Sequence, residues 1–103
     1  MVPPAPPAPP ADLAVRGAQP NPFRDAIDLD FSLGSASHVD LVVYDILGRE
    51  LKVVTRNEWL GAGPQRLSWD GRDAGGREMG AGVYFLKLRT EAASATRVVV
   101  RVK

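Results

Sequence analysis

The chain has 103 residues, of which 45% are hydrophobic and 24% are charged, and its formal net charge is +1. This length allows one small domain, and the balanced charge argues against a nucleic-acid-binding protein. The absence of cysteine excludes a disulfide framework and a thiolate metal site. No apolar run approaches the roughly 20 residues that a membrane-spanning helix needs.

Residues 1–12 are almost entirely proline and alanine. Because proline fixes φ and lacks an N–H donor, they are predicted to form an extended, semi-rigid linker before a domain at residues 13–103. We expect this linker to be a tether, and a tail that docks on an SH3-like groove is the alternative. The start lacks the pattern of a secretory signal, so we expect either a cytoplasmic protein or a piece of a longer one.

The first predicted strands alternate apolar and polar residues. A short strand is expected at residues 13–16, after which two prolines around Asn21 interrupt pairing and leave Phe23 as a buried anchor. Residues 26–33 alternate most regularly, as in a strand that is buried on one face. Residues 39–46 are apolar on both faces, which favours a central position in a sheet.

Turns and an irregular segment connect the next strands. The turn at residues 34–38 contains the only histidine, His38, which we expect to be an exposed loop residue. Residues 47–55 are predicted to form a glycine-containing turn and the strand that returns from it. Residues 56–64 are predicted to be irregular, which makes Trp59 the aromatic side chain best placed to contact a flat ligand.

A glycine-dense loop separates a predicted strand at residues 65–69 from another at residues 83–89. The whole stretch from Trp69 to Leu88 is predicted to be a β-hairpin. Trp69 and Tyr84 are in phase with inward-facing leucines, so we expect them to be core anchors at its two ends.

Asp70 and Asp73 in this loop are the best candidates for metal ligands, because Ca²⁺ accepts carboxylates and loop carbonyls. Their spacing does not match an EF-hand, and Arg72 between them opposes a divalent cation. We therefore expect both carboxylates to accept hydrogen bonds from loop N–H groups, and no metal or other cofactor is predicted. No matched acid–base pair is evident, so we predict no catalytic residue and no enzymatic activity.

The last strand is predicted at residues 95–103, where three alternate residues in a row are valine. We expect that set to face the core and the other set to face solvent. The residues expected in the core are Val98, Val100 and Val102. The residues expected in solvent are Arg97, Val99, Arg101 and Lys103.

About seven short strands at regular intervals, with no helical periodicity, predict an all-β fold. We expect an antiparallel immunoglobulin-like β-sandwich of about seven strands after the Pro/Ala-rich linker, with a small barrel as the alternative.

Several short motifs follow one another between Pro20 and Lys103. Their residues are Asn21, Pro22, Phe23, Tyr44, Asp45, Gly48, Arg49, Trp69, Asp70, Gly71, Asp73, Gly82 and Tyr84. With the valine-rich last strand, this series resembles the C-terminal sorting domain of type IX secretion cargo. The Ig-like domain of flagellar hook-capping proteins is similar to it.

The resemblance implies a non-catalytic module at the C-terminal end of a larger secreted protein. Such a module directs its passenger to the cell surface or the medium, and its implied partners are the outer-membrane translocon, a shuttle protein and the upstream passenger. Neither a nucleic-acid partner nor a membrane span is expected. The passenger and its Sec signal are not in this sequence, so we interpret the chain as an excised domain.

We place the recognition surface on the last hairpin, residues 83–103. The candidate recognition residues are Arg97, Val99, Arg101, Val102 and Lys103. The alternatives are a structural or assembly domain similar to that of the hook cap, or a carbohydrate-binding module that uses Trp59.

Overall fold

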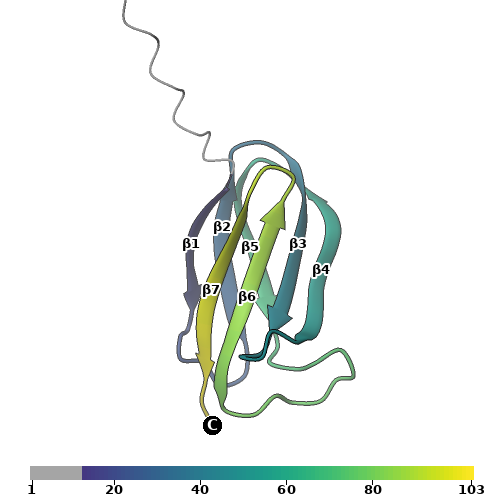
Figure 1. Ribbon diagram of the computed structural model, residues 1–103. Coiled ribbons are helices and arrows are strands. Elements are labelled where there is room, and N and C mark those ends of the chain that lie inside the picture. Colours follow the sequence, from purple (N-terminus) through teal and green to yellow (C-terminus); the bar gives the residue numbers. More distant parts are fainter. Residues whose placement is uncertain (1–12) are drawn as a thin grey trace, which may run out of the picture.

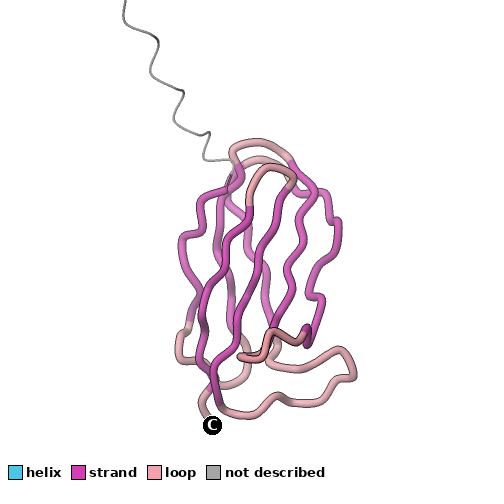
Figure 2. The backbone as a smooth tube through the Cα atoms, viewed as in Figure 1, coloured by secondary structure: helices cyan, strands magenta, loops and turns pink. Residues whose placement is uncertain are grey.

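Every regular element within residues 13–103, the part that the computed structural model describes, is a β-strand (Figures 1 and 2). The linker predicted at residues 1–12 lies outside the described residues. Residues 13–103 accordingly include no helix that could cross a membrane. The strands are β1 (Leu13–Gln19), β2 (Ile27–Leu33), β3 (Ser37–Tyr44), β4 (Glu50–Leu60), β5 (Gly63–Trp69), β6 (Gly82–Thr90) and β7 (Ser94–Arg101).

The strands form two antiparallel sheets with the orders β1-β2-β5 and β4-β3-β6-β7. Figure 1 shows the sheets packed face to face, with the start of β1 at one end of the molecule and Lys103 at the other. The predicted seven-stranded, immunoglobulin-like antiparallel sandwich is therefore confirmed, and the small barrel is wrong.

Apolar side chains from both sheets fill the space between them. In β2 every second side chain is buried, as its alternation predicts, and β3 occupies the predicted position inside its sheet. Burial of a side chain of this size contributes about 1.5–3 kcal/mol, so these residues supply most of the stabilisation. The largest fully buried side chains are Trp69, Phe23, Phe31, Ile27, Leu29, Leu41, Leu86, Leu88, Val39, Val43 and Val99.

Three aromatic rings form the centre of this core. The Trp69 ring lies edge-on to Phe23, with centroids 5.6 Å apart, and edge-on to Tyr84, with centroids 5.3 Å apart. Edge-to-face packing aligns the positive ring edge with the negative face of its neighbour. The expected roles of Phe23, Trp69 and Tyr84 as core anchors are confirmed.

The stretch from Trp69 to Leu88 is not the predicted hairpin. β5 pairs with β2 in one sheet, whereas β6 pairs with β3 and β7 in the other. The glycine-dense loop at residues 70–81 therefore crosses between the sheets. The sequence pattern could not distinguish these arrangements, because in both of them two half-buried strands flank a polar loop.

The segment at residues 56–60, predicted to be irregular, belongs to β4. Its pairing with β3 shifts register between Val39 and Leu41, and Asn57 adopts a φ of 51°. The Asn57 N–H donates to Asp40 Oδ1 at 2.6 Å. A bulge on a largely exposed edge strand breaks the alternation by which a strand is recognised.

His38 lies in β3, not in the predicted exposed turn, and its side chain is partly buried. Its Nδ1 atom is 2.6 Å from Glu91 Oε1, and its backbone pairs opposite Trp59. The strand begins earlier than predicted because Ser37 is itself buried and starts the ladder with β4.

The two faces of β7 are opposite to those predicted. Val99 is fully buried and Arg101 is only 7% exposed, whereas Val98 is 55% exposed. Val99 pairs opposite Tyr84, which faces the core, so Val98 and Val100 point to the outer side of the sheet. The prediction failed because it assumed that an arginine could not find partners inside the sandwich.

Candidate functional site

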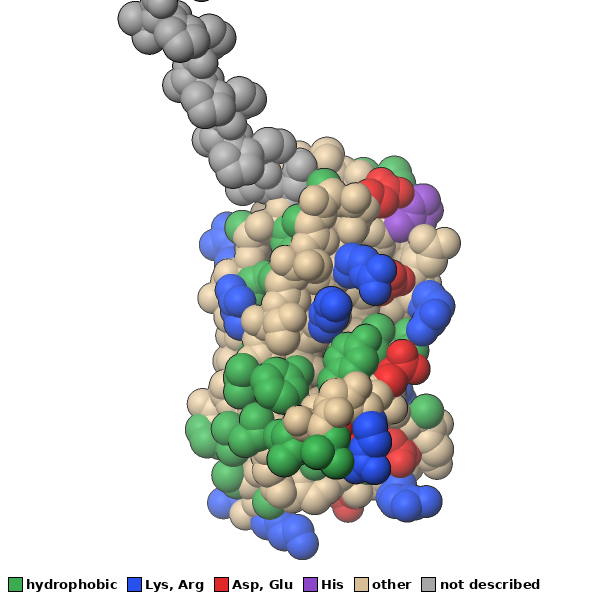
Figure 3. Space-filling model, in the orientation of Figure 1, with side chains coloured by type: hydrophobic (Ala, Val, Ile, Leu, Met, Phe, Trp, Pro, Cys, Tyr) green, Lys and Arg blue, Asp and Glu red, His purple; other side chains and the backbone are tan. Residues whose placement is uncertain are grey.

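Two cross-strand pairs of apolar side chains lie on the outer face of the β6–β7 hairpin. Phe85 pairs with Val98, and Val83 pairs with Val100. We call these four residues the outer apolar strip. Val83 and Val98 are the most exposed of the four, and Figure 3 shows hydrophobic side chains gathered over the lower part of this hairpin.

The outer face of the other sheet is polar by comparison. Arg66 Nε donates to Asp30 Oδ1 at 2.6 Å, and Ser68 hydrogen-bonds Asp28. The hydrogen bond from Arg66 holds the pKa of Asp30 below its usual value. Contiguous exposed apolar groups mark contact sites more often than ion-paired faces do. Of the two outer faces, that of the four-stranded sheet is therefore the candidate site.

A rigid turn extends the apolar surface beyond the strip. Asp45 Oδ1 accepts the N–H groups of Leu47 at 2.9 Å and Arg49 at 3.0 Å, and Asp45 Oδ2 accepts Arg49 Nε at 2.8 Å. The backbone hydrogen bond from Arg49 is the main cause that lowers the pKa of Asp45. Gly48 supplies the predicted positive φ, 78°. This fixed turn leaves Ile46 69% exposed and Leu47 72% exposed.

A hollow of about 650 Å³ lies between this turn and the start of β6. Ile46 and Leu47 line one side, and Met79, Ala81 and Val83 line the other. The hollow is therefore continuous with the outer apolar strip through Val83, and the two features form one surface.

Arg101 connects β7 to the segment before β2 and to the loop at residues 70–81. Its Nε donates to Arg24 O at 2.8 Å, one Nη donates to Met79 O, and the other donates to Glu78 Oε1 at 2.8 Å. These acceptors replace the water that burial removes, which explains why this arginine can face inward. The hydrogen bond from Arg101 also lowers the pKa of Glu78.

Gly71 makes room for this guanidinium. Its φ is 74°, and a Cβ placed there would lie 3.2 Å from Arg101 Nε and 3.2 Å from Asp25 O. Glycine is favoured on both counts, because other residues rarely adopt this φ and a Cβ would push these neighbours away by a few tenths of an ångström. Gly71 thus helps to hold Arg101, and with it β7, in place.

The segment before β2 attaches to the open edge of β7. Phe23 N–H donates to Val100 O at 2.9 Å, and Val102 N–H donates to Phe23 O at 2.8 Å. Asn21 Oδ1 accepts Val100 N–H at 2.9 Å. These bonds pair backbone groups that an edge strand otherwise leaves without hydrogen-bond partners. They also fix the position of Val98 and Val100 on the outer face of the sheet.

Asp70 and Asp73 shape the loop as predicted. Asp70 Oδ1 accepts Arg72 N–H at 3.0 Å, and Asp73 Oδ1 accepts the N–H groups of Gly75 and Arg77, both at 2.9 Å. Within residues 13–103 no group of three or more acidic, histidine or cysteine side chains could hold a metal ion. Asx-type hydrogen bonding accounts for both carboxylates.

The remaining motif residues hold the loop and the turn in place. Trp69 Nε1 donates to Arg72 O at 2.8 Å, and Tyr84 Oη donates to Gly80 O at 2.7 Å. Tyr44 pairs opposite Phe85 on the outer face, and Gly82 begins β6. Pro22 is exposed between Asn21 and Phe23 in the segment that contacts β7.

Only part of the predicted recognition set lies on the surface. Arg97 and Lys103 are exposed and Val102 is half-buried, but Val99 and Arg101 lie inside. The predicted set did not include the exposed large hydrophobic residues of this hairpin and the 45–49 turn, which are Val98, Val83, Ile46 and Leu47. The sequence did contain a signal for this surface. Val83 and Phe85 alternate with the buried residues of β6, which places apolar side chains on the outer face beside β7.

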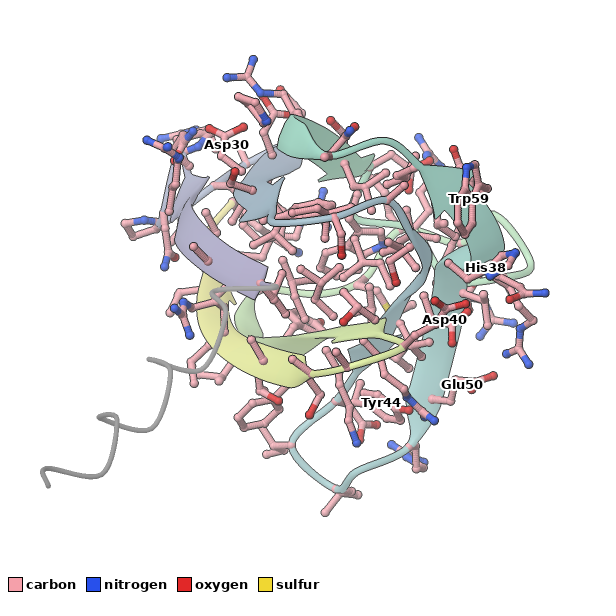
Figure 4. All side chains as sticks on the ribbon, turned by 90° about the horizontal axis from the view of Figure 1, so that it is seen from above. Asp30, His38, Asp40, Tyr44, Glu50 and Trp59 are labelled. Atoms are coloured by element: carbon pink, nitrogen blue, oxygen red, sulfur yellow. The ribbon has the colours of Figure 1, made fainter. Side chains whose placement is uncertain are left out.

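Trp59 is exposed, as the carbohydrate-binding alternative requires, and it lies on the same outer face but on β4, away from the β6–β7 hairpin. Its ring is edge-on to His38 with centroids 4.8 Å apart. Figure 4 shows this pair beside β4, with Asp40 between it and Tyr44. The pair and the outer apolar strip therefore occupy different parts of one outer face.

Comparison of the sequence with family models places most of it in one family. Residues 18–102 match the model of the secretion system C-terminal sorting domain. No curated protein sequence matches the chain. The matched range includes β2 to β7 and only the last two residues of β1.

Three solved structures share the fold. Dimeric latent PorU from Porphyromonas gingivalis gives a TM-score of 0.70 at 19% identity, over 87% of this chain and 9% of PorU. PorZ, an essential bacterial surface component of the type-IX secretion system of the same organism, gives 0.61 at 20% identity, over 93% of this chain and 12% of PorZ. FlgD from P. aeruginosa gives 0.60 at 22% identity, over 88% of this chain and 66% of FlgD.

At these identities the likeness concerns the fold. The chain spans 9% of PorU and 12% of PorZ, and 66% of FlgD. A type IX component and FlgD both occur among these structures, in agreement with the resemblance found in the sequence motifs.

Proposed function

The chain belongs to the secretion system C-terminal sorting domain family of the type IX pathway, and on this premise we propose that it is a non-catalytic sorting signal. It directs a larger polypeptide through the outer membrane to the cell surface or the medium. The family match is the observation that carries the proposal. Its partners are the translocon, a shuttle protein and a passenger joined upstream.

The geometry favours the outer face of the β6–β7 hairpin as the surface that the secretion machinery recognises. Burial of Val98 and Val100 would add to stability, yet both point outward while Arg101 is buried in the same strand. A departure from the pattern expected for folding alone is typical of a functional surface. In this proposal the passenger joins near the start of β1, at the end of the sandwich opposite Lys103 (Figure 1).

The test uses substitutions in the intact chain, fused at the C-terminal end of a folded reporter that carries its own N-terminal Sec signal, in a type IX-competent host. Val98→Asp places a charge in the middle of the outer apolar strip, and we expect export of the reporter to fall by about tenfold or more, as for a central contact residue. Because Val98 is 55% exposed, the variant keeps its fold, which circular dichroism verifies.

Ala14→Asp is the matched control. Ala14 is exposed in β1 and pairs with Ser32 on the outer side of the other sheet, so the same charge there should leave export unchanged. Equal export by Val98→Asp and the parent would exclude this surface. Failure of the parent fusion to leave the cell would exclude the sorting function itself.

A structural or assembly module is the second candidate, favoured by the likeness to FlgD. A structural or assembly function predicts that the purified chain self-associates and that export of the reporter does not depend on the chain. Sedimentation of the purified chain and the export test above distinguish the two functions.

A further inference from the structure

Three cations gather at the upper end of the same outer face. Lys87 and Arg89 continue the outward phase of β6 beyond Phe85, and Arg56 comes from β4. Together they line a hollow of about 250 Å³, which Asp40 and Glu50 also border. Figure 4 shows Asp40 and Glu50 on the outer side of the sheet, and Figure 3 shows basic side chains above the hydrophobic group.

These cations lack the partners that several other arginines have. Arg66, Arg49 and Arg101 each contact a carboxylate within 2.8 Å. Within residues 13–103 no ion pair includes Arg56, Lys87 or Arg89. Asp40 instead accepts the N–H of Asn57. The hollow therefore carries a net positive charge beside an apolar surface.

We propose that this face binds an extended protein segment in which hydrophobic side chains are followed by carboxylates. The hydrophobic side chains cover the outer apolar strip, and the carboxylates contact Lys87 and Arg89. The proposal rests on the proposed function for its role in the cell, because it names the chemistry of the partner that the sorting surface recognises.

The spacing of β6 defines the order of groups in the partner. Phe85, Lys87 and Arg89 point to the same side, and neighbours on one side of a strand are about 6.6–6.8 Å apart. A segment that lies along the strand and covers Phe85 therefore presents its acidic groups two and four residues further along. Apolar contacts supply affinity, and the charges supply orientation and speed of association.

The first experiment uses the full 103-residue chain as bait for a displayed library of random 12-residue peptides. We expect selected peptides to contain two or more alternating hydrophobic residues followed by Asp or Glu. Chemical shifts of the labelled chain should change at Val98, Phe85 and Lys87 when a selected peptide binds. Selection of peptides without acidic residues, or no selection at all, would overturn the proposal.

A charge-reversed bait provides the sharper test. In the Lys87→Glu/Arg89→Glu variant we expect acidic peptides to bind about tenfold more weakly and selection to shift to Lys and Arg at the same positions. For the parent chain, binding should weaken about threefold or more between 50 and 500 mM salt, because salt screens exposed charges. Arg16→Glu/Arg77→Glu, at exposed positions elsewhere, is the control and should bind as the parent does.

The same variants separate this inference from the sorting function. If Val98→Asp blocks export and Lys87→Glu/Arg89→Glu does not, the sorting surface stands and the acidic partner is wrong. If neither change affects export but acidic peptides still select this face, the partner chemistry stands and its role in sorting is wrong. Binding to vesicles of anionic phospholipid in place of peptides would also contradict a protein partner.

Discussion

Arg101 shows how one side chain determines what β7 displays. Its guanidinium contacts Arg24 O, Met79 O and Glu78. These contacts form only when the Arg101 side chain points to the inner side of the sheet. Because side chains alternate along a strand, an inward Arg101 forces Val100 and Val98 outward. The buried arginine and the exposed valines therefore both follow from which face of β7 points into the sandwich.

Arg101→Met should destabilise the sandwich by about 2–4 kcal/mol, since the buried guanidinium no longer donates to the two backbone carbonyls and to Glu78, and only methylene packing remains. Urea unfolding measures this change. Arg97→Met, at an exposed position of the same strand, is the control and should change stability by less than about 0.5 kcal/mol. Equal effects of the two substitutions would mean that the contacts of Arg101 do not support the fold.

Acid should weaken the fold through carboxylates whose pKa values are lowered. The backbone hydrogen bond from Arg49 lowers the pKa of Asp45, and the hydrogen bond from Arg101 lowers the pKa of Glu78. The unfolded chain therefore takes up these protons first as the pH falls. Their stabilisation is complete above about pH 5 and is lost as the pH falls through the lower folded pKa values.

Urea unfolding at pH 7, 5, 4 and 3 tests this expectation. Asp45→Asn keeps an oxygen for the turn N–H groups but loses the charge that faces Arg49, so stability should fall less steeply between pH 5 and pH 3 than in the parent. An identical slope for the variant would exclude Asp45 as a source of the pH dependence.

At the scale of elements, the recognition face depends on segments that are distant in sequence. The segment from Asn21 to Phe23 bonds to β7, and the 45–49 turn lies beside the start of β6. β7 is an edge strand, and edge strands tend to fray or to pair with other chains. The bonds from Asn21 and Phe23 hold it in one register and so keep the outer apolar strip intact.

Asn21→Ala should loosen this edge. Loss of the Asn21 Oδ1 acceptor leaves the Val100 N–H without its bond, which is worth about 1 kcal/mol. Hydrogen exchange should therefore become about fivefold faster at Val100 than expected from the change in global stability. Exchange of the Val102 N–H, which bonds to Phe23 O, is the internal reference. Equal acceleration at both amides would show that the whole edge, and not this bond, has changed.

At the scale of the whole molecule, the C-terminal strand is both part of the core and part of the candidate surface. Val99 packs between the sheets, while Val98 on the same strand is exposed. A deletion therefore removes structural and recognition residues together. Only substitutions on the outer face separate the two roles.

Deletion of residues 98–103 should abolish cooperative unfolding. The deletion removes Val99 and Arg101 from the interior and the carbonyl of Val100 that accepts Phe23 N–H. Urea unfolding followed by tryptophan fluorescence should show no sharp transition, since Trp69 loses the packing of the layer around it. A truncated chain that unfolds cooperatively would contradict this account, and Val98→Asp is the folded control.

Prediction from sequence succeeded where the local sequence pattern is compatible with only one structure. The alternation of β2, the burial of Phe23, Trp69 and Tyr84, and the turn around Gly48 follow from local chemistry, and the structure confirms them. Most residues of the family motifs lie in turns or in the core.

Prediction failed where both choices satisfy the local pattern. In β7 either face carries valine, so hydrophobicity alone favoured the wrong one. The partners of Arg101 are Met79, Glu78 and Arg24, which come 22, 23 and 77 positions earlier in the chain. The loop at residues 70–81 likewise fits a hairpin or a crossing between sheets. Trp59 was placed in a loop because a bulge interrupts β4.

The sequence by itself determined the fold class, the family motifs and most of the core, because alternation, glycine turns and proline breaks act over a few residues. Only the tertiary structure decided which side of β7 is outside, and with it the surface that joins the outer apolar strip to the 45–49 turn. The physical reason is that the side is set by long-range contacts of Arg101, Asn21 and Phe23, which no local pattern contains.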